Sequence, residues 1–367
     1  MKVNFVDLKV QYLAIKDDID AAIRSVIEKT AFSAGPFVKS FEDHFAERHQ
    51  AKFCIGVNSG TAALHLAMWA LGFGPGDEVI VPANTFFATP EAVSLCGAKP
   101  VFVDCEPDFF NIDPGRIEEA ITPNTKAIIP VHLYGQPAQM EKIKAIADKY
   151  HLLLIEDCAQ AHLTEYRGTP VGTFGVCGCF SFYPGKNLGA YGEGGAVLTS
   201  DEGLYKKTMA LRDHGSSQKY YHDFVGHNYR MEGIQGAVLD VKLKYLEDWT
   251  RMRRNNADLY RKHLAGMTQV AVPREMPNAK HVYHLFVVKV GRREELKNFL
   301  QDKGIFTGIH YPVPCHLQKA YASIKPRNPL PVSEKIADEI LSLPMYAELP
   351  EDQIRYVCDK IKEFYKK

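Results

Sequence analysis

No apolar run in the 367-residue chain approaches the roughly 20 residues that a membrane-spanning helix needs. Neither charge sign is in excess, since 44 basic side chains balance 44 acidic ones. A basic run with interleaved aromatics, an internal repeat and a low-complexity linker are also missing. These absences argue against a role in binding nucleic acid or a membrane. Because the start, Met1 to Asn4, lacks the apolar stretch of a signal peptide, we expect a cytoplasmic protein.

Cysteine is sparse and scattered. Of the eight cysteines, only Cys177 and Cys179 lie close together in the sequence. A structural zinc site needs more ligands than one such pair supplies, and no second pair or histidine cluster lies at ligand spacing. We therefore expect reduced cysteines in the core and no metal site.

Strand-like apolar runs alternate with helical patterns from about residue 40 to 200. This alternation predicts an α/β fold with a mostly parallel sheet that is covered on both faces. A charge-rich helical stretch from Glu232 to about His263 is expected to lead into a smaller C-terminal α+β domain. We predict a large domain over residues 1–245 and a small one over residues 246–367.

The segment from Ser181 to Gly195 places one lysine, Lys186, among glycine, proline and aromatic residues. Its pattern is strand, turn, strand, which differs from that of a charge on an exposed helix. Partial burial beside Phe182 and Tyr183 would lower the pKa of the amine and make it a nucleophile. Schiff-base formation with an aldehyde, above all pyridoxal phosphate, needs such an amine. The alternative is a lysine that closes a turn and points into water.

A buried strand-like run from Leu152 to Ile155 ends in Glu156 and Asp157. Open α/β sheets bind ligands at the carboxyl ends of their strands. An anion beside the pyridine nitrogen of pyridoxal phosphate keeps the ring protonated and able to accept electrons. Asp157 is the candidate for this partner, because Glu156 would alternate to the other side of the strand. The alternative for Asp157 is a helix N-cap.

Two further segments could complete a cofactor site. After the strand-like run Phe53 to Val57, Gly60 and Thr61 begin a helix whose backbone amides could bind a phosphate. Plain capping by Ser59 or Thr61 is the alternative. Phe86, which follows another buried strand, could stack on a flat heteroaromatic ring or simply belong to the core.

In this order and spacing, the segments resemble the sugar aminotransferase family called DegT/DnrJ/EryC1/StrS, which has the aspartate aminotransferase fold (fold type I). The resemblance covers nearly the whole chain, from Asn4–Leu8 through Phe37–Glu42 to Gly308–Pro312. A match in several parts is specific where one glycine loop would not be. It implies an aminotransferase with pyridoxal 5'-phosphate as cofactor.

The resemblance implies a role for each matching residue. Lys186 would hold the cofactor and, once released, act as the base that moves the proton, while Asp157 would hold the pyridine nitrogen. Gln160 would lie near the phenolic oxygen of the cofactor. Asn228 looks like the asparagine that reaches the phosphate of a neighbouring subunit, which implies a homodimer with shared active sites. Phosphate and ring contacts would come from Gly60, Thr61, Ser181 and Phe86.

The implied substrates are a nucleotide sugar and an amino acid donor, glutamate. The run Phe182–Gly189, together with Gln160–His162, resembles enzymes that aminate position 3 of dTDP-linked 3-keto-6-deoxyhexoses; a 4-aminotransferase is the alternative. Leu163 departs from the family, where glycine is expected, and would alter the local substrate pocket. Arginine or lysine on a loop would meet the pyrophosphate. The candidate substrate residues are Tyr183, Arg212, Lys219, Arg230, His310 and Tyr311, each with a solvated charge or an interior hydrogen bond as its alternative.

Two other classes of protein stay open. A nicotinamide-dependent oxidoreductase could use Gly192–Gly195 as a dinucleotide loop, but that run leads into the strand-like Ala196–Thr199 and not into a helix. A non-catalytic regulatory protein could keep the same fold. Intact Lys186 and Asp157 favour an enzyme.

Overall fold

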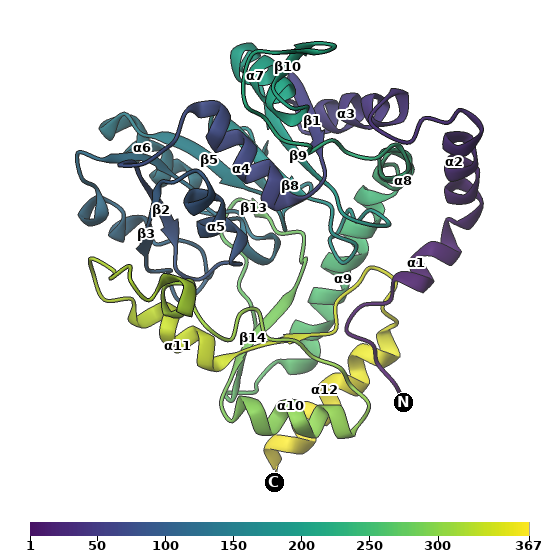
Figure 1. Ribbon diagram of the computed structural model, residues 1–367. Coiled ribbons are helices and arrows are strands. Elements are labelled where there is room, and N and C mark those ends of the chain that lie inside the picture. Colours follow the sequence, from purple (N-terminus) through teal and green to yellow (C-terminus); the bar gives the residue numbers. More distant parts are fainter. Residues whose placement is uncertain (367) are drawn as a thin grey trace.

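A seven-stranded sheet organises the larger part of the protein in the computed structural model, which describes residues 1–366 (Figure 1). In chain order its strands are β1 (Phe53–Val57), β2 (Glu78–Pro82), β3 (Lys99–Val103), β4 (Thr125–Ile128), β5 (Leu153–Asp157), β8 (Cys177–Ser181) and β9 (Gly195–Thr199). In space they follow the order β1-β9-β8-β5-β4-β2-β3. β9 runs antiparallel to both of its neighbours, and the other neighbouring pairs are parallel. The prediction of a mostly parallel sheet is confirmed.

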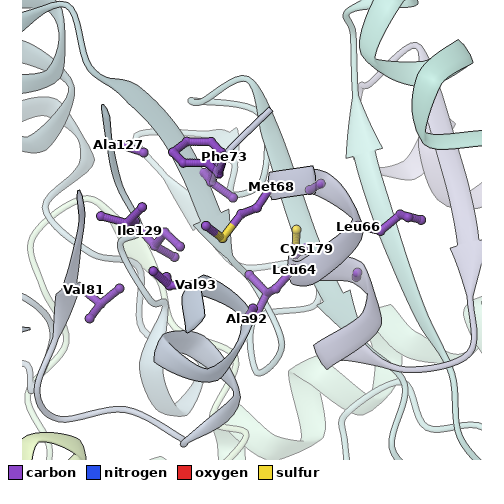
Figure 2. Close-up of a cluster of buried hydrophobic side chains, with 14 of the residues drawn as sticks. Leu64, Leu66, Met68, Phe73, Val81, Ala92, Val93, Ala127, Ile129 and Cys179 are labelled. Atoms are coloured by element: carbon purple, nitrogen blue, oxygen red, sulfur yellow. The ribbon is translucent and has the colours of Figure 1, made fainter. Parts of the chain in front are cut away.

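Alternate side chains along the strands enter hydrophobic cores on opposite faces of this sheet. Val79 and Val81 belong to a core on one face, which we call the first core, whereas Ile80 between them belongs to a core on the opposite face. Figure 2 shows the first core, where Leu64 and Met68 lie among residues from the strands and the next helix. The helices on this face are α4 (Gly60–Leu71), α5 (Ala88–Leu95) and α7 (Glu202–Arg212). Those on the other face are α3 (Pro36–Arg48), α6 (Met140–Tyr150) and α8 (Gly233–Leu243).

The C-terminal part contains a small antiparallel sheet of β12 (Val270–Ala271), β14 (Phe286–Val290) and β15 (Ile340–Leu343). Its helices are α9 (Leu246–Leu264), α10 (Arg293–Asp302), α11 (Pro331–Glu339) and α12 (Glu351–Lys366). The helical stretch expected from Glu232 to about His263 is two helices, α8 and α9, and α9 extends toward the small sheet (Figure 1). Val3 pairs with Ile305 and packs in the C-terminal core, so the first residues join this part. The division at residue 245 stays a prediction.

The remaining elements lie around these two sheets. They are α1 (Leu8–Ala14), α2 (Lys16–Glu28), the sheet of β6 (Glu165–Tyr166), β7 (Thr169–Pro170) and β13 (Ala279–Lys280), and the hairpin of β10 (Ser216–Gln218) and β11 (Tyr221–His222). The hairpin projects from the top of the molecule in Figure 1. Across residues 1–366, none of the helices combines the length and apolarity required to span a bilayer.

Candidate active site

A cavity of about 690 Å³ lies where the parallel strands of the large sheet end. Much of its wall comes from residues that directly follow β1, β2, β5 and β8, which is where open α/β sheets bind ligands. The predicted residues that line it are Gly60, Thr61, Phe86, Asp157, Gln160, Ser181, Tyr183, Lys186, His310 and Tyr311. Residues from five separate parts of the sequence therefore meet in one place, as the resemblance implied.

Lys186 lies on the loop between β8 and β9. Hydrogen bonds between backbone groups of this loop hold its two ends together. Phe182 N donates to Gly194 O at 2.7 Å, and Ala190 N donates to Phe182 O at 2.8 Å. Burial lowers the pKa of Lys186 to about 8, although the negative charge of Asp157 opposes that shift. Near neutral pH a much larger fraction of this amine is thus uncharged than of an ordinary lysine, and the uncharged amine is the form that acts as a nucleophile or a base.

Asp157 is the last residue of β5 and is only 4% exposed. Its Oδ1 accepts a hydrogen bond from Ala159 N at 3.0 Å, and its Oδ2 accepts one from Thr89 Oγ1 at 2.8 Å. Burial raises its pKa, while these two hydrogen bonds and the charge of Lys186 oppose the rise. No helix follows β5 before β6 within the described chain, so the N-cap interpretation is wrong. The carboxylate instead faces the cavity.

Glu156 points to the opposite side of β5, as the strand alternation predicts, and braces the strand end. Its oxygens accept hydrogen bonds from the backbone amides of Gly172, Phe174 and Gly175 at 2.7, 2.7 and 2.9 Å. His132 adds a fourth contact, because Nδ1 accepts from Ala138 N and Nε2 donates to Glu156 at 3.0 Å.

His132, Glu156 and Cys158 have possible ligand atoms within 4.8 Å of one another, and all three residues are buried. The hydrogen bonds of Glu156 and His132 already occupy the groups that a metal would need. His132 N also donates to Asp157 O at 3.0 Å. His132 and Glu156 therefore hold the end of β5, and with it Asp157, in place.

The start of α4 forms a cradle that only small residues allow. Ser59 Oγ caps the helix by accepting from Ala62 N at 3.0 Å, and Gly60 and Thr61 line the cavity beside it. A Cβ on Gly60 would lie 2.5 Å from Ser181 Cβ, and one on Gly195 would lie 2.2 Å from Ser59 O. Capping by Ser59 therefore leaves the helix start facing the cavity, where an anion could bind. The cradle fits the phosphate of the expected cofactor.

Phe86 is 54% exposed and lies on the cavity wall, so the interpretation as a core aromatic is wrong. Its ring centre is 5.4 Å from that of Tyr311, with the planes inclined by 42°. Gln160 is held between two tyrosines, because Oε1 accepts from Tyr134 N at 2.7 Å and Nε2 donates to the Tyr311 hydroxyl at 3.1 Å. A buried carboxylate, an amine, an exposed aromatic face and an anion cradle together fit pyridoxal phosphate.

Several cavity residues escaped the sequence analysis. Phe5, His284, Met345 and Glu193 also line the cavity. Phe5 stacks on His310 with ring centres 5.6 Å apart, and burial lowers the pKa of His310 to about 4, so this imidazole is neutral. The N-terminal run that contains Phe5 carried the family resemblance, and this signal could have identified it. No comparable local pattern marks His284 or Met345.

The prediction for Arg212 is wrong. The residue ends α7 and is 7% exposed, and its Nη1 donates to Glu42 Oε1 and to Gly56 O, both at 2.7 Å. The guanidinium therefore belongs to an interior ion pair and not to a loop that could meet a substrate. The sequence could not show this, because Glu42 precedes Arg212 by 170 positions.

Three other predicted residues lie outside the cavity of this chain. Arg230 forms an ion pair with Asp213, and Lys219 lies on the exposed hairpin with its Nζ 5.1 Å from the Tyr220 ring centre. Asn228 is exposed and pairs with Asp213 across the base of that hairpin. Their roles in binding substrate or a neighbouring subunit's phosphate stay predictions.

Leu163 occupies a left-handed backbone conformation, with φ of 63°, which explains why glycine would be expected there. Its side chain is buried in the core beside α3 and α8 and does not line the cavity. The predicted effect on the substrate pocket is therefore wrong. The run Gly192–Gly195 leads into β9, so the helix that a dinucleotide loop requires is absent at that position.

We expect Asp157→Asn to lower the pKa of Lys186 below its value of about 8. The negative charge of Asp157 raises that pKa, so a neutral isostere removes the opposition to desolvation. In the cofactor-free protein, the rate at which Lys186 reacts with an aldehyde should then reach half its maximum at a lower pH. Glu193→Gln is the matched control, which should leave this pH unchanged. An equal response of both variants would contradict the pairing of Asp157 with Lys186.

Comparisons with known proteins place the chain in a family. Residues 13–362 match the model of the DegT/DnrJ/EryC1/StrS aminotransferase family. A protein of Geobacillus stearothermophilus named pleiotropic regulatory protein is 46% identical, with 100% of this chain and 99% of that protein covered. The dTDP-3-amino-3,4,6-trideoxy-alpha-D-glucose transaminase of Streptomyces venezuelae is 44% identical, with 99% of this chain and 96% of the relative covered.

A solved structure agrees with these matches. The crystal structure of S. venezuelae DesV in complex with a ketimine intermediate superposes with a TM-score of 0.97 at 44% identity, covering 100% of this chain and 99% of that one. Such agreement over the whole length assigns the fold of type I aminotransferases. The chain belongs to the DegT/DnrJ/EryC1/StrS aminotransferase family and is a pyridoxal phosphate-dependent aminotransferase.

Proposed function

We propose that this aminotransferase moves the amino group of glutamate to position 3 of a dTDP-linked 3-keto-6-deoxyhexose. The observation that carries the proposal is the cavity in which Lys186 and Asp157 meet beside the anion cradle at the start of α4. The similarity to a dTDP-3-amino sugar transaminase over nearly the full length supports the choice of substrate.

Bound pyridoxal phosphate supplies an electron sink that stabilises a carbanion next to nitrogen. Lys186 holds the cofactor and, with a pKa of about 8, can take a proton from the α-carbon of the donor and return it to the sugar carbon. Asp157 would hold the pyridine nitrogen, and Thr89 and Ala159 keep its carboxylate in position. Ser181, Gly60 and Thr61 would hold the phosphate.

The wall of the cavity supports a 6-deoxy sugar. Phe5, Val6, Leu285 and Met345 present apolar side chains there, and such a surface suits a methyl group better than a charged or hydroxylated carbon. Tyr183, which is 55% exposed at the same cavity, and His310 would contact the hexose.

The proposal includes a homodimer in which Asn228 reaches the phosphate of the neighbouring subunit, and Lys219 and Arg230 meet the pyrophosphate. Its support is the exposed hairpin, which carries Tyr220 and Tyr221 at 80% and 66% exposure. We also place the protein in the cytoplasm. All eight cysteines are unpaired and seven are buried, which suits a compartment that keeps thiols reduced.

The test begins with the visible absorption of the protein with pyridoxal phosphate. Addition of glutamate should convert the band of the lysine-bound cofactor to that of pyridoxamine phosphate. A dTDP-3-keto-6-deoxyhexose should then restore the first band and yield a 3-amino sugar, identified by mass spectrometry and NMR. Reaction with a 4-keto sugar alone would establish the 4-aminotransferase alternative. Absence of any cofactor band would favour a regulatory protein and overturn the proposal.

Gly60→Ala is expected to weaken pyridoxal phosphate binding by at least about tenfold, because the added methyl lies 2.5 Å from Ser181 Cβ and must separate α4 from β8. The cofactor dissociation constant, measured by titration of the visible band, checks this. Gly74→Ala is the control, since a Cβ there meets nothing within 4 Å. Equal affinities of the two variants would show that the cradle does not hold the phosphate.

A further inference from the structure

The loop that carries Lys186 returns toward β9 along a path with no room for side chains. A Cβ on Gly189 would lie 2.3 Å from Pro184 O. The outgoing arm of the loop, at Pro184, and its returning arm, Gly189 to Tyr191, therefore touch through their backbones. Lys186 N also donates to Tyr183 O at 2.8 Å. The position of the returning arm therefore determines where the Lys186 backbone lies.

Two side chains of α8 hold that returning arm. Lys242 Nζ donates to Gly189 O at 2.7 Å and lies 4.3 Å from the centre of the Tyr191 ring. Gln235 Oε1 accepts from Tyr191 N at 2.9 Å. Because Lys242 and Gln235 are seven residues apart, they project from the same face of the helix. One face of α8 thus binds the returning arm at Gly189 and at Tyr191.

Lys242 is an unusual residue for this task, because it is only 1% exposed. Burial lowers its pKa to about 8, with the charge of Glu348 opposing the shift. An uncharged side chain of similar volume would fill the same space without the desolvation cost of an ammonium. What such a side chain could not supply is the donor to Gly189 O and the cation facing the Tyr191 ring.

We propose that Lys242 is a positioning residue, whose hydrogen bond to Gly189 O holds the returning arm against Pro184 and so keeps the Lys186 amine in its desolvated place. The inference rests on the proposed function only in treating Lys186 as the reacting amine. It concerns residues of this chain that touch neither cofactor nor sugar, since neither Lys242 nor Gly189 lines the cavity.

The test measures Lys186 in the full-length, cofactor-free protein. Competitive labelling of lysines with acetic anhydride, read by mass spectrometry across pH 6 to 10, gives the reactivity of Lys186 relative to a surface lysine. In Lys242→Met a loosened arm would expose Lys186 to water, raising its pKa toward that of an ordinary lysine. Labelling at pH 7 should fall at least about threefold. Lys244→Met, at an exposed position two residues further, is the control and should leave Lys186 unchanged.

Two more variants separate positioning from mere stability. Lys242→Arg keeps a cationic donor and should restore most of the Lys186 reactivity, whereas Gln235→Leu removes the second grip and should shift it in the same direction as Lys242→Met. If Lys242→Met does not fold, Gln235→Leu carries the test. A lowered melting temperature with unchanged Lys186 labelling would overturn the proposal. Because no cofactor or sugar is present, this result stands apart from the assay of the proposed function.

Discussion

Lys186→Ala is expected to abolish amino transfer while the protein stays folded. The substitution removes both the group that holds the cofactor and the base that moves the proton, and loss of the base alone costs about 10²–10⁴-fold. The fold should tolerate the loss of the amine, because the carboxylate of Asp157 keeps its hydrogen bonds from Thr89 Oγ1 and Ala159 N. Conversion of bound cofactor by glutamate, followed by absorption in a single turnover, should be undetectable.

The same variant should still bind a preformed adduct of the cofactor with the amino sugar, because Asp157 and the cradle at Gly60 are unchanged. Equilibrium dialysis measures that affinity. Lys244→Ala, an exposed lysine on the surface, serves as the control for loss of one positive charge. Substantial turnover by Lys186→Ala would mean that another group is the base.

Arg212→Met is expected to lower the free energy of unfolding by about 3–5 kcal/mol, because it leaves the carboxylate of Glu42 buried without its partner. Side-chain exposures of 8% for Arg212 and 6% for Glu42 allow little solvent to compensate. The carbonyl of Gly56 loses the same donor. Denaturation in urea, with the midpoint and slope fitted together, measures the change.

Arg230→Met is the matched control, since its ion pair with Asp213 is half-exposed and such pairs contribute about 0–1 kcal/mol. Combining Arg212→Met with Glu42→Leu should recover part of the lost free energy of unfolding, because no buried charge is then left without its partner. If Arg212→Met left the stability unchanged but greatly raised the KM for the nucleotide sugar, Arg212 would be a substrate-binding residue after all.

The local sequence was sufficient for the central pair of the site. Lys186 and Asp157 stand at or just beyond the ends of buried strands, and apolar runs with turn residues mark such ends clearly. In a mostly parallel sheet, these ends meet at one edge whatever the rest of the fold does. Gly60 and Ser181 follow the same rule, and they complete the cradle at that edge.

The wrong predictions for Arg212 and Leu163 both depend on contacts with residues far away in the sequence. Arg212 looked like a loop cation because it borders the irregular segment Asp213 to Asn228, whereas its partner Glu42 lies on α3. Leu163 looked like a pocket residue because it follows the cofactor segment, yet its left-handed backbone turns the side chain into the core. Neighbours along the chain cannot show either contact.

The sequence by itself determined the fold class, the family, the cofactor and the residues at the strand ends, because strand periodicity and turn chemistry are local. Tertiary structure alone decided that His284 and Met345 enter the cavity, and that Lys242 is buried beneath the lysine loop. Such residues reach the site through the packing of the C-terminal sheet and α8 against the large sheet. Their contacts depend on the summed burial of many side chains, a quantity that no short pattern in the chain contains.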